Sequence, residues 1–138
     1  MKKVILTIAV VLASVSVNAQ LEVKAKTTSE VVWTATKLSP IPKIVKILNE
    51  SDSIYTLFYR DAQYTQIVEI EYITFNNVEE VNQFVEICKQ VIESGESVSL
   101  TLNGDDLYIA KSAWTCYIRK NGNSFFYLSK KQLETINL

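Results

Sequence analysis

A long amphipathic helix is predicted over about residues 77–94, and no other feature constrains the fold as strongly. Asn77 and Glu80 have the spacing of a capping box at its start, and Gly95 stands where a left-handed C-cap belongs. A helix with one apolar stripe must cover another apolar surface. The stripe consists of side chains at steps of three and four, namely Val78, Val81, Phe84, Val85, Cys88, Val91 and Ile92.

Strand-like patterns lie on both sides of this helix. Residues 54–59 carry apolar or aromatic side chains in both alternate sets, which is typical of a central strand. In residues 67–75, Val68, Ile70 and Tyr72 alternate with a set that contains two glutamates, which predicts a half-buried strand with the glutamates facing outward. Further strands are predicted at residues 31–33, 44–48, 97–102, 107–110, 114–119 and 125–128.

Turn and cap signals connect the segments that follow the helix. Asn103-Gly104 and Asn121-Gly122 are typical of hairpin turns, and Ser129 with Gln132 forms a capping box for a short C-terminal helix. Strands and helices do not alternate regularly. We therefore predict an α+β fold, with an antiparallel β-sheet of about six to eight strands (a β-meander, then hairpins) packed by the long helix and the short C-terminal helix.

The first 19 residues have the pattern of a signal peptide. Lys2 and Lys3 precede an apolar run from Val4 to Ala13, and Val17-Asn18-Ala19 resembles a cleavage site. Residues 20–138 are then a single globular α+β domain, exported to the periplasm or the exterior and without stable membrane insertion after cleavage. The alternative is an uncleaved anchor or a buried first helix.

Composition excludes several classes of function. The chain has 14 basic and 15 acidic residues, two of the lysines belong to the predicted signal peptide, and the other basic residues are scattered. Nucleic-acid binding needs clustered positive charge, so no nucleic-acid partner is expected. Histidine is absent and only three glycines are present, which removes His-based catalysis, His-ligated metals and glycine-rich phosphate loops. We predict no catalytic residue, no cofactor and no metal site.

The two cysteines both fall on predicted core faces. Cys88 belongs to the helix stripe, and Cys116 alternates with Trp114 and Ile118 on the apolar side of a strand. In an oxidising compartment, a disulfide between Cys88 and Cys116 would clamp the helix to the sheet. The other interpretation is two unpaired buried thiols that behave as small hydrophobes.

Four carboxylates, Glu69, Glu71, Asp105 and Asp106, are the candidates for acid–base chemistry. Glu69 and Glu71 share one face of a strand at about 6.6 Å between Cα atoms, a separation that overlaps that of paired glycosidase carboxylates. The simpler interpretation is a solvated face. Asp105 and Asp106 follow Asn103 at a predicted hairpin tip, which lacks the spacing of a calcium loop.

The aromatic residues suggest a binding surface. Tyr55, Tyr59, Tyr117, Phe125 and Tyr127 lie on strands, and if they converge opposite the long helix they form a platform for a glycan or a peptide. The alternative is a second core layer. The function predicted from the sequence is an exported, non-catalytic binding or interaction protein with an unknown protein or glycan partner; the alternative is a small carboxylate-based hydrolase.

Overall fold

The computed structural model describes residues 27–36, 41–49 and 52–138, so the predicted signal peptide lies outside the described residues. The chain divides into two compact units, one of residues 29–47 and 53–138 and the other of residues 1–28 and 48–52. Of the latter unit, the structure describes only strand ends: Thr27, Thr28, Leu48, Asn49 and Asp52. Apart from these strand ends, the features below belong to the larger unit.

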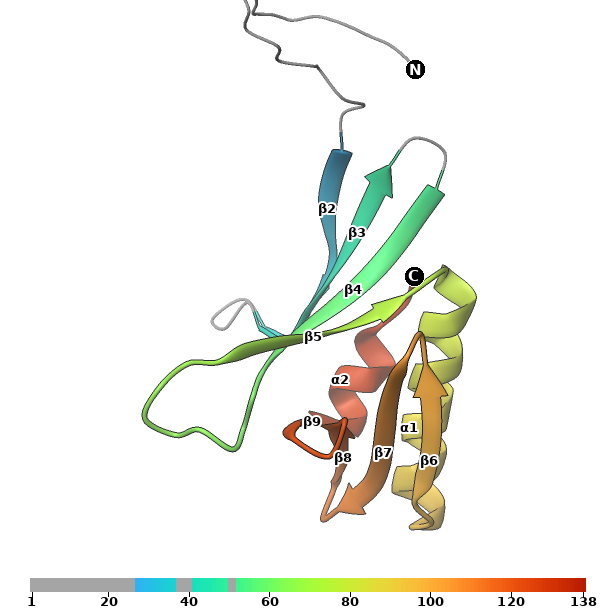
Figure 1. Ribbon diagram of the computed structural model, residues 1–138. Helices are drawn as coiled ribbons and strands as arrows, with labels where there is room; N and C mark the ends of the chain where they lie inside the picture. Colours follow the sequence, from blue (N-terminus) through green and yellow to red (C-terminus); the bar gives the residue numbers. More distant parts are fainter. Residues whose placement is uncertain (1–26, 37–40, 50–51) are drawn as a thin grey trace, which may run out of the picture. The chain divides into compact units, whose positions relative to one another are not determined.

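The described strands form two antiparallel four-stranded sheets, each a meander of neighbouring strands (Figure 1). The first sheet consists of β2 (Thr27–Thr34), β3 (Lys43–Asn49), β4 (Asp52–Arg60) and β5 (Ile70–Phe75), in that order. The second consists of β6 (Val98–Leu102), β7 (Asp105–Ser112), β8 (Thr115–Lys120) and β9 (Ser124–Ser129), also in order. The predicted α+β class is confirmed, and the strands are divided between two sheets.

The long helix α1 (Val78–Ser94) begins and ends where the caps predict. The Asn77 side chain accepts a hydrogen bond from the Glu80 backbone N–H at 2.9 Å, and Gly95 has a φ of 78° in the left-handed region. The Glu80 carboxylate accepts from the Asn76 backbone N–H at 2.8 Å, so the reciprocal bond of the capping box is shifted by one residue.

Tight turns connect neighbouring strands of the second sheet. Asn103 and Gly104 both have positive φ, as a two-residue type I′ turn requires. Asn121 and Gly122 repeat this pattern between β8 and β9. The short helix α2 (Lys130–Thr135) then starts with the predicted capping box, in which Ser129 and Gln132 bond reciprocally at 3.1 and 2.9 Å.

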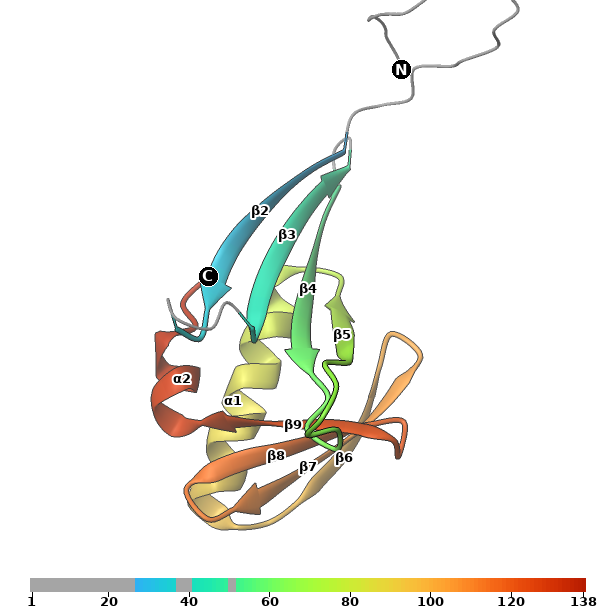
Figure 2. The ribbon, with the colours of Figure 1, turned by 90° about the vertical axis from the view of Figure 1, so that its left-hand side faces the viewer.

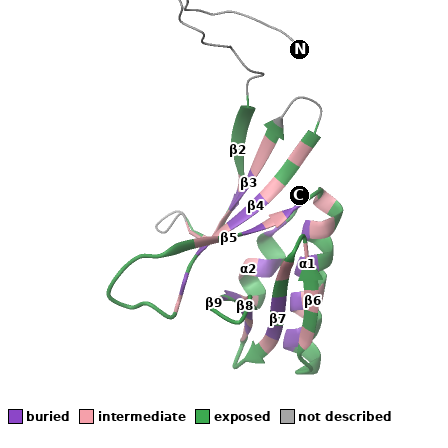
Figure 3. Cartoon of the chain, in the orientation of Figure 1, coloured by how far each residue is buried: buried purple, intermediate pink, exposed green. Residues whose placement is uncertain are grey.

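One apolar core joins the helices to both sheets (Figure 3). Helix α1 packs against one face of the second sheet (Figure 2), and six of its seven predicted stripe residues are buried. Each large side chain buried here stabilises the fold by about 1.5–3 kcal/mol relative to exposure. Each sheet supplies side chains to this core from one face, among them Ile44, Leu57, Tyr59, Ile73 and Phe75 in the first and Leu107, Ile109, Cys116, Ile118, Phe126 and Leu128 in the second.

The faces of one strand are the reverse of the prediction. In β5, Ile73 and Phe75 are buried, and Glu71 lies two residues before Ile73 on the same face. Ile70 and Tyr72 point to the other face and are exposed. The inward Glu71 is tolerated because it is only half-buried and its carboxylate lies 3.5 Å from the Lys120 ammonium.

Trp114 also differs from its predicted place. It precedes β8, within the turn after β7, and 83% of its surface is exposed. Its predecessor Ala113 has a φ of 54°, so the backbone turns there and the strand alternation does not extend back to Trp114.

Candidate functional site

Four aromatic rings and one arginine gather on the face of the second sheet that points away from α1. Strand register creates this grouping: Tyr108 pairs with Arg119, and Arg119 pairs with Phe125 on the next strand. The neighbouring row pairs Tyr117 with Tyr127. Side chains directly opposite or diagonal on one face come into contact. We call these five residues, Tyr108, Tyr117, Arg119, Phe125 and Tyr127, the aromatic face.

The rings of the aromatic face contact each other at tilted or edge-on angles. The Tyr117 ring is central: its centroid lies 5.2 Å from Phe125, 5.6 Å from Tyr127 and 6.5 Å from Tyr108. Phe125 and Tyr127 meet edge-on at 6.0 Å and 87°. These separations fall in the favourable range for aromatic pairs.

The guanidinium of Arg119 lies over two of these rings. Its central carbon is 5.6 Å from the Tyr117 centroid and 5.9 Å from that of Phe125, within the range of cation–π attraction. The Arg119 side chain is nevertheless exposed. The aromatic face thus combines apolar ring surface, tyrosine hydroxyls and one accessible positive charge.

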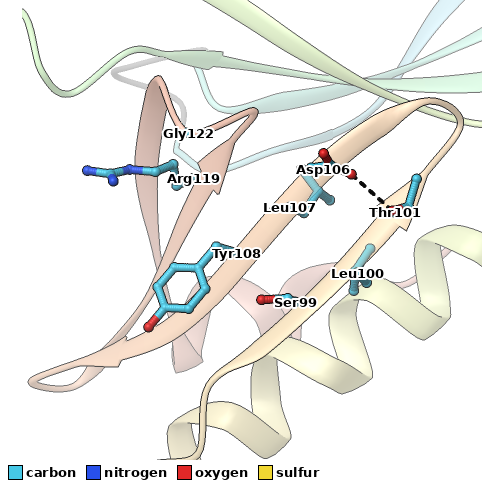
Figure 4. Close-up of a pocket in the computed structure, with 8 residues that line it drawn as sticks. All are labelled: Ser99, Leu100, Thr101, Asp106, Leu107, Tyr108, Arg119 and Gly122. Carbon is cyan, nitrogen blue, oxygen red and sulfur yellow. Dashed lines mark hydrogen bonds between the residues drawn. The ribbon is translucent and has the colours of Figure 1, made fainter.

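A hollow of about 250 Å³ borders the aromatic face over β6, β7 and β8 (Figure 4). Tyr108 and Arg119 line it together with Ser99, Thr101 and Asp106. The Thr101 hydroxyl donates a 3.0 Å hydrogen bond to the Asp106 carboxylate, so two of these lining residues are bonded to each other. The hollow therefore adds small polar groups beside the rings.

The structure brings together three of the five aromatic residues singled out in the sequence, Tyr117, Phe125 and Tyr127, but not the other two. Tyr59 is fully buried, stacks on Phe126 with centroids 4.0 Å apart and shares a 2.6 Å hydrogen bond with the Ser124 hydroxyl. Burial raises the pKa of the Tyr59 phenol to about 12. Tyr55 is half-buried and packs against the core.

Sequence reasoning missed Tyr108 and Arg119. Their pairing follows from the two-residue turn between Ser112 and Thr115, which fixes the register of β7 against β8. A turn signal at Ala113-Trp114 would have placed both residues beside Tyr117, but neither residue is a usual turn former.

Cys88 and Cys116 lie side by side in the core as free thiols. The hydrogen bond that the Cys88 thiol makes with the Cys116 side chain, together with burial, raises the pKa of Cys88 well above its ordinary value. The thiol is therefore almost entirely protonated at neutral pH, and protonated thiols are poor nucleophiles. The predicted disulfide stays a prediction.

Three of the four carboxylates have partners, and these partners differ from one another. Glu71 pairs with Lys120, Asp105 accepts a 3.0 Å hydrogen bond from the Asn121 side chain, and Asp106 accepts from Thr101. Glu69 precedes β5 and is exposed. Asp105 and Asp106 are adjacent in one strand and so point to opposite faces.

Across residues 27–36, 41–49 and 52–138, no group of three or more Cys, Asp or Glu side chains is placed to hold a metal ion. Over the same residues, no helix combines the length and the apolar character needed to cross a membrane.

Comparisons with protein-family models, with curated proteins and with solved structures find no match for this chain.

Proposed function

We propose that this chain is an exported, non-catalytic binding protein that recognises a protein partner through its aromatic face. The observation that carries the proposal is the cluster of Tyr108, Tyr117, Phe125 and Tyr127 around Arg119 on an exposed sheet face. Tyrosine and arginine are enriched in the residues that dominate binding energy in protein interfaces.

Arg119 defines the chemistry of the partner. Its guanidinium rests on aromatic rings, and no acidic side chain among the described residues forms an ion pair with it. A guanidinium binds carboxylates through paired hydrogen bonds and is weakly hydrated, so burying it in an interface costs less than burying an ammonium. We infer a partner surface that places a carboxylate among apolar groups.

Ring geometry favours a protein over a glycan. The rings of the aromatic face are inclined to each other by 42° to 87°, so they do not form one flat surface. Sugar rings stack on flat open ring faces, whereas side chains of a protein partner fit between inclined rings. Trp114 adds a largely exposed indole at the tip of the β7–β8 hairpin, and tryptophan is another residue enriched in interface hot spots.

The test is affinity capture with matched variants. Immobilised wild-type protein, the double variant Tyr108→Ala/Tyr127→Ala and the control Tyr64→Ala are incubated with the secreted and envelope fractions of the native source. Tyr64 is a fair control because it is 42% exposed, compared with 43% for Tyr108 and 44% for Tyr127, and it lies between β4 and β5. Bound proteins are quantified by mass spectrometry.

We expect a protein that wild type and Tyr64→Ala retain equally and that the double variant loses by about tenfold or more. Equal capture by all three would overturn the proposal. Capture of polysaccharide in place of protein would assign the same face to a glycan. The carboxylate-based hydrolase has no separate observation in its favour.

A further inference from the structure

One face of the first sheet carries apolar side chains that no described helix or strand covers. It is the face turned away from the core, because Ile44, Leu57 and Ile73 of the same strands alternate with it and are buried in the core. Figure 2 views this face, with α1 behind β3 and β4. We call it the outer face, and its apolar members are Val45, Ile47, Ile54, Phe58, Ile70 and Tyr72.

Several of these apolar side chains are open to water. Ile54, Ile70 and Tyr72 are 37%, 40% and 52% exposed. Phe58 is half-buried and pairs with Tyr72 on the next strand, with the two ring centroids 6.3 Å apart. A contiguous exposed apolar patch on a folded protein marks a surface that binds another molecule.

Positive charge gathers at one end of the outer face. Lys43 begins β3, and its ammonium lies 5.9 Å from the centre of the Phe58 ring. Arg60 ends β4 two residues after Phe58, so it points to the same face, where it is exposed. Arg60 donates a hydrogen bond to the Ile67 carbonyl at 3.2 Å. Among the described residues, no ion pair includes Lys43 or Arg60.

Negative charge lies further along the same face. Trp33 of β2 is buried in the core, so Glu30, three residues earlier, points to the outer face, and it is exposed. The Ala35 N–H donates to the Pro42 carbonyl at 2.9 Å, which places the end of β2 beside the start of β3. Glu30 therefore lies about 13 Å along the strands from the level of Lys43. It forms no ion pair with any described residue.

Two copies of this face match each other's charges when their strands run in opposite directions. Sheets that pack face to face lie about 10 Å apart and interdigitate their side chains. A two-fold axis between the sheets, perpendicular to the strands and at the level of Val45, lies midway between the levels of Lys43 and Glu30. Such an axis brings Lys43 of one copy to Glu30 of the other, and each contact occurs twice.

We propose that the outer face of the first sheet is the interface of a homodimer, in which two copies stack face to face with antiparallel strands. The apolar side chains would fill its centre, and Lys43 of each copy would pair with Glu30 of the other. An unrelated acidic partner would match Lys43 and Arg60 but would leave Glu30 opposite like charge. The proposal does not depend on the function proposed above, because the aromatic face belongs to the other sheet.

Edge-to-edge pairing of two copies is hindered at two edge strands. On β9, the Phe125 carbonyl accepts from the Ala62 N–H at 2.8 Å, and the Phe125 N–H donates to the Asp61 carboxylate at 3.2 Å. On β5, the Lys120 ammonium donates to the Tyr72 carbonyl at 2.7 Å. Backbone groups that are already bonded are one of the ways in which proteins prevent strand pairing at sheet edges.

The outer face has the size of a weak interface. Its four strands have six to nine residues each, so it measures roughly 20 Å across the strands and 20–30 Å along them. This footprint is smaller than the ~800 Å² that each partner buries in a standard protein interface. We therefore expect a dimer that dissociates on dilution.

The test is a charge exchange followed by sedimentation equilibrium of the full chain, from about 1 µM to about 1 mM. The variants are Glu30→Lys and Lys43→Glu, each alone and then mixed in equal amounts. Each variant alone has two repulsive contacts in its dimer, whereas a pair of unlike copies has two attractive ones. The matched controls are Glu134→Lys and Lys131→Glu, which make the same changes at exposed positions of α2.

We expect wild type and both controls to form dimers with dissociation constants within about twofold of each other. Glu30→Lys and Lys43→Glu should each associate at least about tenfold more weakly, and their mixture should recover to within about threefold of wild type. Ile54→Thr, which keeps a β-branched side chain but adds a hydroxyl, should weaken the dimer about fivefold. Circular dichroism checks that every variant is folded.

A wild type that stays monomeric at all of these concentrations would overturn the proposal. Equal weakening by the α2 controls would also overturn it, because association would then follow overall charge. A mixture that stays as weak as its components would exclude the antiparallel arrangement. The Tyr108→Ala/Tyr127→Ala variant should dimerise like wild type; loss of its dimer would assign self-association to the aromatic face instead.

Discussion

The outward faces of the two sheets differ in chemistry although their inward faces share one core. In the second sheet, the outward side chains are mainly tyrosine, arginine, serine and threonine, and each carries a polar group at its end. In the first sheet, the outward side chains of β4 and β5 include Ile54, Phe58 and Ile70, and these three side chains have no polar group. A tyrosine-rich face can stay exposed to water and still bind a partner, and this difference supports the proposal that the second sheet carries the binding surface.

The largest difference in stability is expected on β9, where neighbouring aromatic residues point to opposite faces. Phe126→Ala removes a ring that stacks on Tyr59 in the core, so it should lower the free energy of unfolding by about 3–5 kcal/mol. Tyr127→Ala on the aromatic face should cost about 1 kcal/mol or less. Urea denaturation followed by circular dichroism measures both. Similar losses would mean that the aromatic face is a second core layer.

The corresponding test of the first sheet uses β5. Ile73→Ala should lower the free energy of unfolding by about 2–5 kcal/mol, because Ile73 is fully buried. Tyr72→Ala should cost much less, since 52% of its surface is exposed. The same urea experiment applies. A larger loss for Tyr72→Ala than for Ile73→Ala would mean that Tyr72 faces the core, as the sequence pattern predicted.

The cysteine pair tests how firmly α1 is held to the second sheet. Refolding with oxidised glutathione should convert two thiols to one disulfide while the reagent is reduced to two glutathione thiols. We expect the oxidised protein to be more stable by about 2–4 kcal/mol than the Cys88→Ala variant. Mass spectrometry detects the loss of two hydrogen atoms, and urea denaturation gives the stability.

Oxidation of the folded protein should be much slower than during refolding, because both thiols are buried and the pKa of Cys88 is raised. Failure to form the disulfide on refolding, or a less stable oxidised form, would establish the pair as free core thiols.

A smaller effect is expected at the hydroxyl pair of Tyr59 and Ser124, which links β4 to β9. Ser124→Ala leaves the buried phenol without this partner and should cost about 1–3 kcal/mol. The phenol also makes stability depend on pH. Because the folded pKa is about 12, compared with 10.0 for the exposed group, the folded state retains its proton longer than the unfolded state. Stability should therefore fall as the pH rises above about 10.

Tyr59→Phe removes this titration and should give a shallower loss of stability between pH ~10 and ~12. Tyr127→Phe is the control, because its exposed phenol lies outside the core. Equal slopes for the wild type and Tyr59→Phe would show that Tyr59 is not the group responsible.

Local signals predicted much of this structure. Asn77, Gly95 and Ser129 act through neighbours in the chain, so their caps were found at the correct residues. The division of the strands into two sheets depends on pairing between distant segments, which no local pattern specifies.

The face of a strand was predictable only where its alternate sets differ in polarity. In β8, Cys116 and Ile118 contrast with Thr115 and Arg119, and the prediction was correct. In β5 both sets contain large apolar residues, so the position of Glu71 misled the prediction. The candidate site was found in part for a similar reason: Tyr117, Phe125 and Tyr127 stood out as aromatics, whereas Arg119 acquires its place among them only through cross-strand register.

The Asp61 and Ala62 contacts with β9 have a consequence for stoichiometry. A sheet with two open edges can lengthen by repeated addition, in the way that a bifunctional monomer forms a polymer. Here residues of the same chain already bond both backbone groups of Phe125 on β9, which is one edge strand of the second sheet, and β6 is the other edge strand. A strand that added at the β9 edge would first have to displace these two bonds, so growth of this sheet from both ends is disfavoured.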